Sequence, residues 1–142
     1  MILLRDDVLT VQELRLAPHP VHKVPTLFFQ ILRAGTSQRV GDINLRLAST
    51  PHIERYAGHI GFTIDPVHRG RRYAARAIGS LIPLAREHGL NVLWITCDPD
   101  NVPSRRTCEL AGAQFIEIVD VPAHCIIHRS GHPKKCRYRL DL

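Results

Sequence analysis

Residues 61–74 read GFTIDPVHRGRRYA, and this stretch decides which fold the sequence predicts. An apolar run typical of a strand is followed by an Asp-Pro break, and a basic turn with a glycine then opens an alanine-rich helix. The first backbone N–H groups of a helix have no partner within it, and the helix dipole places partial positive charge there. A diphosphate can therefore dock at this turn, where Arg69, Arg71 and Arg72 add full charges.

The composition of the chain is that of one folded domain. With 142 residues, 44% of them hydrophobic and 23% charged, the chain is expected to form a single domain over residues 1–142 with one core. No apolar run approaches the ~20 residues of a membrane span, and the opening MILLRDD is too short for a signal peptide. We therefore expect a cytoplasmic protein.

The net charge of +6 is compatible with a nucleic-acid binder, a protein for acidic ligands, or a basic surface without a binding role. Its distribution favours an acidic ligand, because basic residues gather between His68 and Arg76 at the predicted helix start. A second basic cluster, His132 to Arg139, is interpreted as a solvated edge strand. Nucleic-acid binding is disfavoured, because aromatic residues make up only 6% of the chain and no nucleic-acid motif is present.

The four cysteines, at 97, 108, 125 and 136, have no CxxC spacing, and we interpret them as reduced thiols without disulfides. The segment 124–136 also holds histidines, which raises the question of a zinc site. Their spacing matches no zinc pattern, and the segment lies between two predicted strands. It is interpreted as a polar loop, and no metal is predicted.

The pattern of apolar residues predicts strands in the first half of the chain and two helices in the second. One helix over 70–88 repeats apolar residues every three or four positions and ends before Gly89, and a second covers 103–110. The apolar run at 92–97 should lie parallel to the strand at 57–65 in a right-handed βαβ unit. The predicted strands are 8–16, 26–33, 40–47, 57–65, 92–97, 114–121 and 136–142.

Two motifs in this setting resemble the GNAT superfamily of N-acetyltransferases over roughly residues 40–142. They are HRGRRYA between a strand and a helix, and DPDNVPSRRTCELAGA after the next strand. The resemblance implies an α+β fold with a GNAT-like mixed central sheet and a parallel βαβ core. Many relatives place two helices between their first two strands. This chain has the proline-bearing APHPVHKVP there, so that helix pair should be shortened or absent.

The resemblance also implies acetyl-CoA as the cosubstrate. Arg69, Arg72 and Ala74 match the phosphate motif of the family, and Arg72 replaces its central glycine, while Gly70 remains available for close backbone approach. The pantetheine arm would lie in the splay between the strands at 57–65 and 92–97, as an added strand. The implied contacts with acetyl-CoA come from Phe62, Thr63, Ile64, Arg69, Gly70, Arg71, Arg72, Tyr73, Ala74, Ala75, Asn101 and Ser104.

The implied reaction is the direct transfer of acetyl from acetyl-CoA to a primary amine. A tyrosine seven residues after the Asn supplies a proton to the leaving thiolate in many relatives, and here that position is Cys108. Its ordinary alternative is a small buried core residue. The glutamate of some relatives is replaced by Thr96, so the sequence favours Glu54 as the base, over Asp42 and His59. The ordinary alternative for Glu54 is a surface carboxylate.

The acceptor matches no motif in the sequence. Its site is expected to be either open or closed by the segment 122–133, together with a second subunit in a homodimer, and His19, His22 and Lys23 lie where they can border it. Two other classes of function stay open. One is a non-catalytic module that binds acyl-CoA for regulation, and the other, disfavoured above, is a basic nucleic-acid-binding domain.

Overall fold

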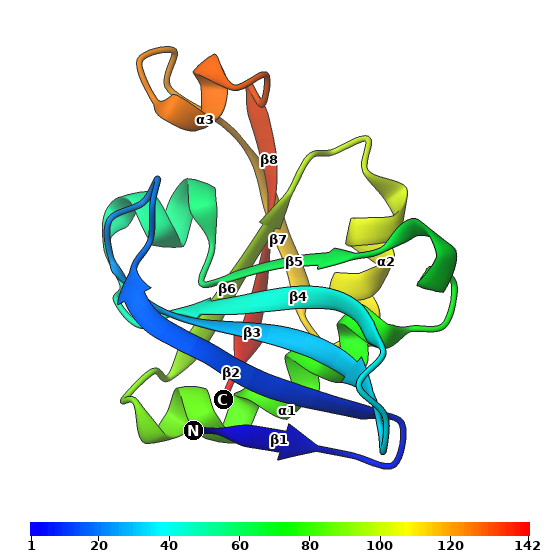
Figure 1. The fold of residues 1–142 in the computed structure, drawn as a ribbon. Coiled ribbons are helices and arrows are strands. Elements are labelled where there is room, and N and C mark those ends of the chain that lie inside the picture. The colour runs from blue at the N-terminus through cyan, green and yellow to red at the C-terminus, as the bar shows by residue number, and fades with distance from the viewer.

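The protein, described here by a computed structural model of residues 1–142, alternates strands and helices around two sheets (Figure 1). Its elements in chain order are β1 (Leu3–Arg5), β2 (Leu9–Pro18), β3 (Pro25–Arg33), β4 (Arg39–Arg46), the π-helix η1 (Ile53–Ala57), β5 (Ile60–Ile64), the 3₁₀ turn η2 (Pro66–His68), α1 (Tyr73–Glu87), β6 (Val92–Cys97), α2 (Val102–Leu110), β7 (Gln114–Asp120), α3 (Ile126–Arg129) and β8 (Lys134–Asp141).

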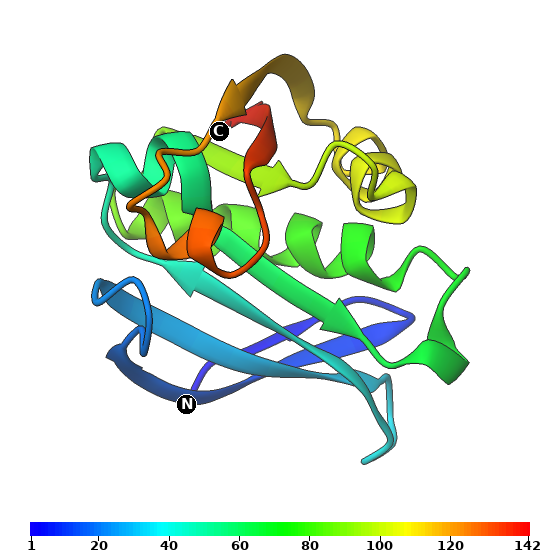
Figure 2. The ribbon, with the colours of Figure 1, turned by 90° about the horizontal axis from the view of Figure 1, so that it is seen from above.

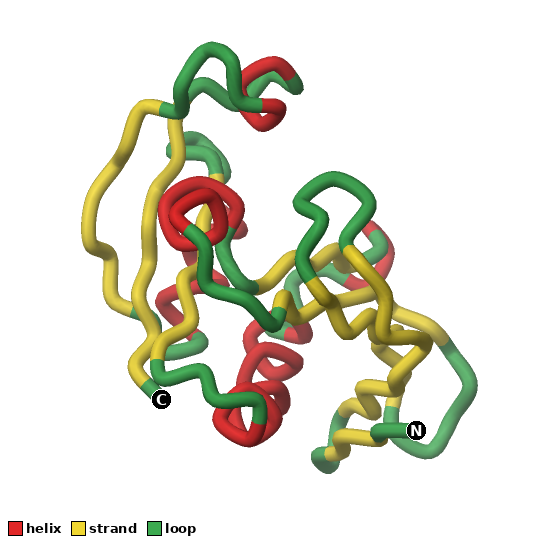
Figure 3. Tube along the Cα trace, turned by 90° about the vertical axis from the view of Figure 1, so that its left-hand side faces the viewer, coloured by secondary structure: helices red, strands yellow, loops and turns green.

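The strands form one five-stranded and one three-stranded sheet. The first has the order β1-β2-β3-β4-β5 and is antiparallel throughout, and the second has the order β6-β8-β7 and is also antiparallel. Period-two alternation explains the buried face of the larger sheet: in β3, Leu27, Phe29 and Ile31 are buried and the residues between them are partly exposed. Figure 3 shows α1 and α2 between the two groups of strands.

Helix α1 carries the apolar face that the sequence predicts. Ala74, Ala77, Ile78, Leu81 and Ala85 are buried at three- and four-residue spacing, and the helix packs against the five-stranded sheet (Figure 2). The helix is continuous although Pro83 lies inside it. Because this packing fixes α1 against the end of β5, it also fixes where the helix begins, which is where the predicted diphosphate turn lies.

Strands β5 and β6 lie side by side only at their start. There His59 N donates to Trp94 O at 2.7 Å, and Trp94 N donates to Nδ1 of the His59 ring at 2.9 Å. Beyond this point the two strands belong to different sheets and diverge while running in the same general direction, as Figures 1 and 2 show. Gly58 permits the close approach, because its φ is 74° and an added Cβ would lie 2.9 Å from Trp94 O.

The fold class predicted from the sequence is confirmed in its α+β character: the chain has a βαβ core and no helix pair between β2 and β3, where residues 19–24 form a short turn. The predicted parallel pairing of β5 with β6 in one mixed sheet does not form, because the two strands diverge into separate antiparallel sheets. The prediction missed three short elements, namely β1, η1 and α3. It also began the central strand at residue 57, which the structure places at the end of η1. None of the helices has the length and apolar character that crossing a membrane would require.

Candidate active site

A cleft of about 650 Å³ lies between the end of β5, the start of α1 and the exposed side of α2. Of the residues that the sequence predicts to contact the coenzyme, all except Ala75 line this cleft. Ala75 is half-buried inside α1, one residue beyond the lining segment. Two segments that are distant in the chain, one ending at Ala74 and the other beginning at Asn101, thus line the same opening.

The turn before α1 presents backbone donors and cations to this cleft. No side chain caps the helix, and its first hydrogen bond runs from Arg76 N to Arg72 O, so the N–H groups of residues 73–75 have no intrahelical partner. The Arg69 Nε donates to Ile64 O at 3.0 Å and ties the turn to β5. Arg71 and Arg72 remain exposed.

Arg72 has a backbone conformation that favours glycine. Its φ of 62° and ψ of 23° lie in the left-handed region, which side chains with a Cβ adopt only at a cost of roughly 1–2 kcal/mol. The arginine at this position is therefore strained where a glycine would not be.

Helix α2 forms the opposite wall. Its N-cap Asn101 accepts a hydrogen bond from Ser104 N at 3.2 Å, so Asn101 has a structural role as well as a place in the cleft. Arg106 also lines the cleft, and the sequence analysis missed it. The signal was available, because Pro103, Arg106 and Leu110 recur at helical spacing on one face of α2.

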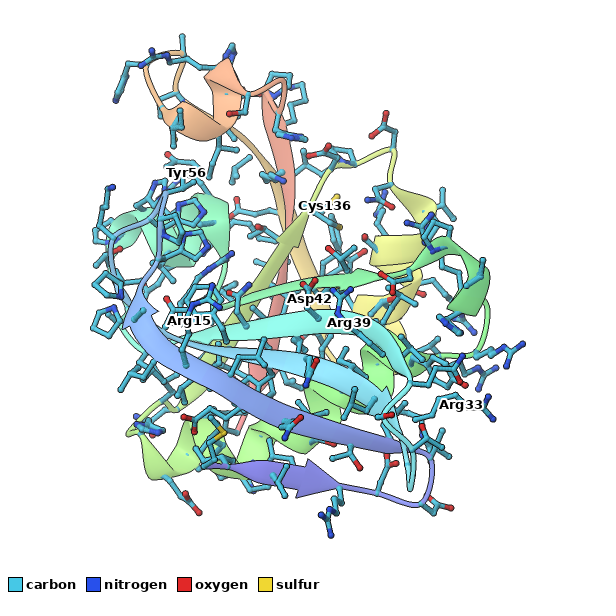
Figure 4. All side chains as sticks on the ribbon, in the orientation of Figure 1. Arg15, Arg33, Arg39, Asp42, Tyr56 and Cys136 are labelled. Atoms are coloured by element: carbon cyan, nitrogen blue, oxygen red, sulfur yellow. The ribbon has the colours of Figure 1, made fainter.

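A second cavity of about 370 Å³ adjoins the cleft. Phe62, Asn101 and Ser104 line both, so the two spaces meet between the diverging β5 and β6. Residues of η1, β6, α3 and β8 enclose the second cavity. Figure 4 shows one of them, Tyr56 on η1, below the α3 segment. The lining also includes His22, Arg46, Ala57, Ile60, Thr96, Cys97, Asp98, Ile126, Ile127, Ser130, His132 and Lys135.

The junction of the two spaces exposes an unpaired edge of β5. Asp65 N donates to Val40 O and Arg46 N donates to His59 O, so every second residue of β5 points its backbone groups toward β4. By the alternation of an antiparallel ladder, Phe62 and Ile64 point theirs toward the splay. The Ile64 carbonyl already accepts from Arg69, which leaves the N–H and C=O of Phe62 free at the junction.

In the second cavity the carboxylate of Asp98 contacts a histidine and a lysine. Its Oδ2 lies 2.7 Å from His132 Nδ1, and its Oδ1 lies 3.0 Å from Lys135 Nζ. Burial raises the pKa of Asp98, but the ion pair with Lys135 and the hydrogen bond with His132 outweigh it, and the pKa is lowered overall. Asp98 therefore stays ionised and orients His132, whose Nε2 is left free of the carboxylate.

The carbonyl groups at the end of η1 are held by side chains from other strands. Thr96 Oγ1 donates to Tyr56 O at 2.8 Å, and Arg137 donates to Glu54 O through Nε and Nη2. Helix ends leave such carbonyls without intrahelical partners. These contacts involve only the backbone of Glu54. Its side chain lines neither cavity, whereas the sequence analysis suggested it as the base.

The predicted proton donor, Cys108, also lies outside the cavities. It is fully buried in the core beside Cys97, and the hydrogen bond with Cys97 together with burial raises the pKa of its thiol. Packing in the core therefore separates this thiol from the reacting atoms. Of the other base candidates, His59 is buried at the β5–β6 contact, and Asp42 forms a 2.8 Å ion pair with Arg39 on the surface, where both are labelled in Figure 4.

The segments that the sequence predicts to border the acceptor differ in their relation to the second cavity. His22 lines the second cavity, whereas His19 and Lys23 do not. The segment 122–133 does close the cavity, through Ile126, Ile127, Ser130 and His132. No group of three or more His, Cys, Asp or Glu side chains is arranged to hold a metal ion.

A family model described as an acetyltransferase (GNAT) domain matches residues 12–114. Among solved structures, an acetyltransferase of the GNAT family from Bacillus anthracis shares 17% identity and a TM-score of 0.72, with 99% of this chain and 98% of that chain covered. A ribosomal α-N-protein acetyltransferase in complex with coenzyme A shares 11% identity and a TM-score of 0.71, with 99% and 98% covered.

A protein from Vibrio cholerae described as a ribosomal-protein-serine acetyltransferase shares 22% identity and a TM-score of 0.64 over 82% of this chain. The chain spans only 64% of the length of that protein. No curated protein sequence matches the chain. At these identities the structural comparisons show a common fold, and the family model adds the shared sequence pattern.

Proposed function

This chain belongs to the GNAT acetyltransferase family, and we propose that it transfers an acetyl group from acetyl-CoA to a primary amine. The observation that carries the proposal is the meeting of the two cavities at Phe62, Asn101 and Ser104. One space suits an anionic coenzyme and the other a small acceptor. The point where they join is the place for the thioester.

The larger cleft fits the diphosphate of coenzyme A by charge. Four arginines line it together with the open N-terminus of α1, and no Asp or Glu lines it. The four are Arg69, Arg71, Arg72 and Arg106. Arginine suits phosphate because its planar guanidinium donates in a fork. Helix N–H groups add fixed donors at the same place.

The free backbone edge of Phe62 supplies the groups that a thioester needs. Its N–H lies at the junction, where it can stabilise the oxyanion that develops when the amine nitrogen attacks the thioester carbon. The pantetheine arm can pair with the same edge as an added strand. The C–N bond forms to give this oxyanion, whose collapse breaks the C–S bond, and the leaving thiolate takes up the proton that the amine nitrogen loses.

We propose that His132 is the base that accepts the proton from the amine. Histidine is the side chain that most often accepts a proton in enzymes, and Asp98 orients this one with a 2.7 Å contact. Asp98 and Asn101 share one turn, since Asn101 N donates to Asp98 O at 3.0 Å, which keeps the pair near the junction. This assignment replaces Glu54 and Cys108, which line neither cavity.

Acetyl-CoA binding and turnover test the proposal separately. We expect calorimetry to show binding of acetyl-CoA, and a thiol assay to show coenzyme release in the presence of a panel of primary amines. Binding with no release on any amine would instead support a regulatory acyl-CoA module. Absence of binding would refute the assignment of the cleft. An Arg69→Ala, Arg72→Ala double variant should weaken binding, and unchanged affinity would also count against the assignment.

A further inference from the structure

The second cavity contains a buried cation without a counter-ion. Arg46, at the end of β4, is only 7% exposed, yet it forms no ion pair. Burial lowers the pKa of its guanidinium to about 10. An unpaired buried charge is costly, and side chains that carry one are usually paired or belong to a binding site.

One half of the Arg46 guanidinium is hydrogen-bonded to backbone carbonyls of the fold. Its Nη1 donates to Ala57 O at 2.8 Å and to Gly58 O at 2.9 Å, the carbonyls of the last residue of η1 and of its C-cap. The other half makes no hydrogen bond: Nε is buried without a partner, and Nη2 donates to no group. The Nε and Nη2 edge is the one that binds a carboxylate or phosphate with two parallel hydrogen bonds.

No carboxylate contacts this edge, since Asp98, the acid that lines the same cavity, is paired with His132 and Lys135. Gly61 lies beside it, and an added Cβ there would lie 2.8 Å from Arg46 Nη2 and 2.9 Å from Asn44 Nδ2. The bare glycine therefore leaves room for both donors. His22, which also lines the cavity, has its pKa lowered to about 3 by burial and by the charge of Arg46, so it stays neutral and adds no second positive charge beside Arg46.

We infer that the amine acceptor carries an anionic group on the same molecule, and that Arg46 binds this group through its Nε and Nη2 edge. The inference rests on the proposed function and names the acceptor class of that site. A cavity of about 370 Å³ suits a small molecule with the amine at the junction and a carboxylate or phosphate at the Arg46 end.

Matched pairs of acceptors test the inference on the wild-type protein. Alanine against alaninamide tests a carboxylate, and glucosamine 6-phosphate against glucosamine tests a phosphate. We expect the anionic member of at least one pair to have a kcat/KM about 10–100-fold higher, since a charged hydrogen-bonded pair is lost in the neutral member. Equal kcat/KM within both pairs would overturn the inference.

Arg46→Met should reduce that preference to about one by raising KM for the anionic acceptor, while the KM for acetyl-CoA is unchanged. Arg137→Met is the matched control, because Arg137 is also buried and also donates to an η1 carbonyl but does not line the cavity. The control should keep the preference. A preference that survives in Arg46→Met would contradict the inference.

A binding measurement on the wild-type protein separates this inference from the proposed function and does not depend on a folded variant. With coenzyme A present, N-acetylalanine should raise the unfolding temperature, and N-acetylalaninamide should not. If the two compounds give the same shift, the inference is wrong even where amines are acetylated. If N-acetylalanine alone binds but no amine is ever acetylated, the anion site stands and the transfer reaction is refuted.

Discussion

Replacing Arg72 by glycine should make the protein more stable and lower its affinity for coenzyme A. Arg72 has a φ of 62°, and relief of the left-handed strain is worth roughly 1–2 kcal/mol. Glycine also gives the unfolded chain more freedom, which costs roughly 0.5–1 kcal/mol. The free energy of unfolding should therefore rise by about 0.5–1 kcal/mol, and the unfolding temperature by roughly 2–4 °C.

The same change removes one of the arginines that line the coenzyme cleft. An exposed charge pair contributes at most about 1 kcal/mol, so the affinity for coenzyme A should fall about fivefold at low salt. The loss should shrink as salt screens the interaction. Thermal unfolding without ligand and calorimetry with coenzyme A measure the two effects independently.

Two variants separate strain from charge. Arg72→Ala loses the same charge but keeps a Cβ at positive φ, so it should bind coenzyme A as weakly as Arg72→Gly and show no gain in stability. Arg71→Gly removes a neighbouring cleft arginine whose φ is not positive, and it should not be stabilised. The reasoning fails if Arg72→Gly is no more stable than Arg72→Ala, or if Arg71→Gly gains as much.

Three further predictions concern the acceptor side of the site and its supports. His132→Gln should lower kcat/KM for the amine by at least about 100-fold, and Asp98→Asn should lower it by less. The affinity for acetyl-CoA should be unchanged in both variants. A normal pH–rate profile in His132→Gln would exclude this residue as the base. Cys108→Ala should keep full turnover and lose about 1 kcal/mol of stability, and a collapse of kcat in a folded variant would restore the thiol as the acid. Burial and the charge of Arg46 lower the pKa of His59 from 6.5 to about 4, so the unfolded chain takes up a proton first as pH falls. His59 should contribute a drop of up to about 3 kcal/mol to the free energy of unfolding between pH 6.5 and about 4, measured by denaturant titration. His59→Asn, which can still accept from Trp94 N, should lose this contribution and keep that of His22, whose pKa is lowered to about 3.

The residues that line the proposed coenzyme cleft could largely be predicted from the sequence because they belong to local segments. Residues 69–74 and 101–104 each form one turn and one helix start, so their chemistry follows from residue order alone. The βαβ unit between them has one favoured handedness, which brings the two starts to the same side. The structure places both segments around one cleft.

The acceptor half could not be predicted in the same way. The place of Glu54 just before the central strand and the spacing of Cys108 from Asn101 point to a role in catalysis, but position along the chain does not determine the direction in which a side chain packs. His132 and Asp98 are 34 residues apart and meet only because β8 pairs with β6. Arg46 was not singled out at all, since a charged residue at the end of a strand is usually solvated.

By itself the sequence determined the fold class, the family and the basic helix start that suits a diphosphate, since these depend on periodicity, turn residues and short motifs. Only the tertiary structure decided what faces the acceptor. Which arginine is left with an open edge, and which histidine a carboxylate orients, depends on contacts between β4, η1, β6 and β8. Such contacts are made by packing between segments distant in the chain, and no local pattern encodes them.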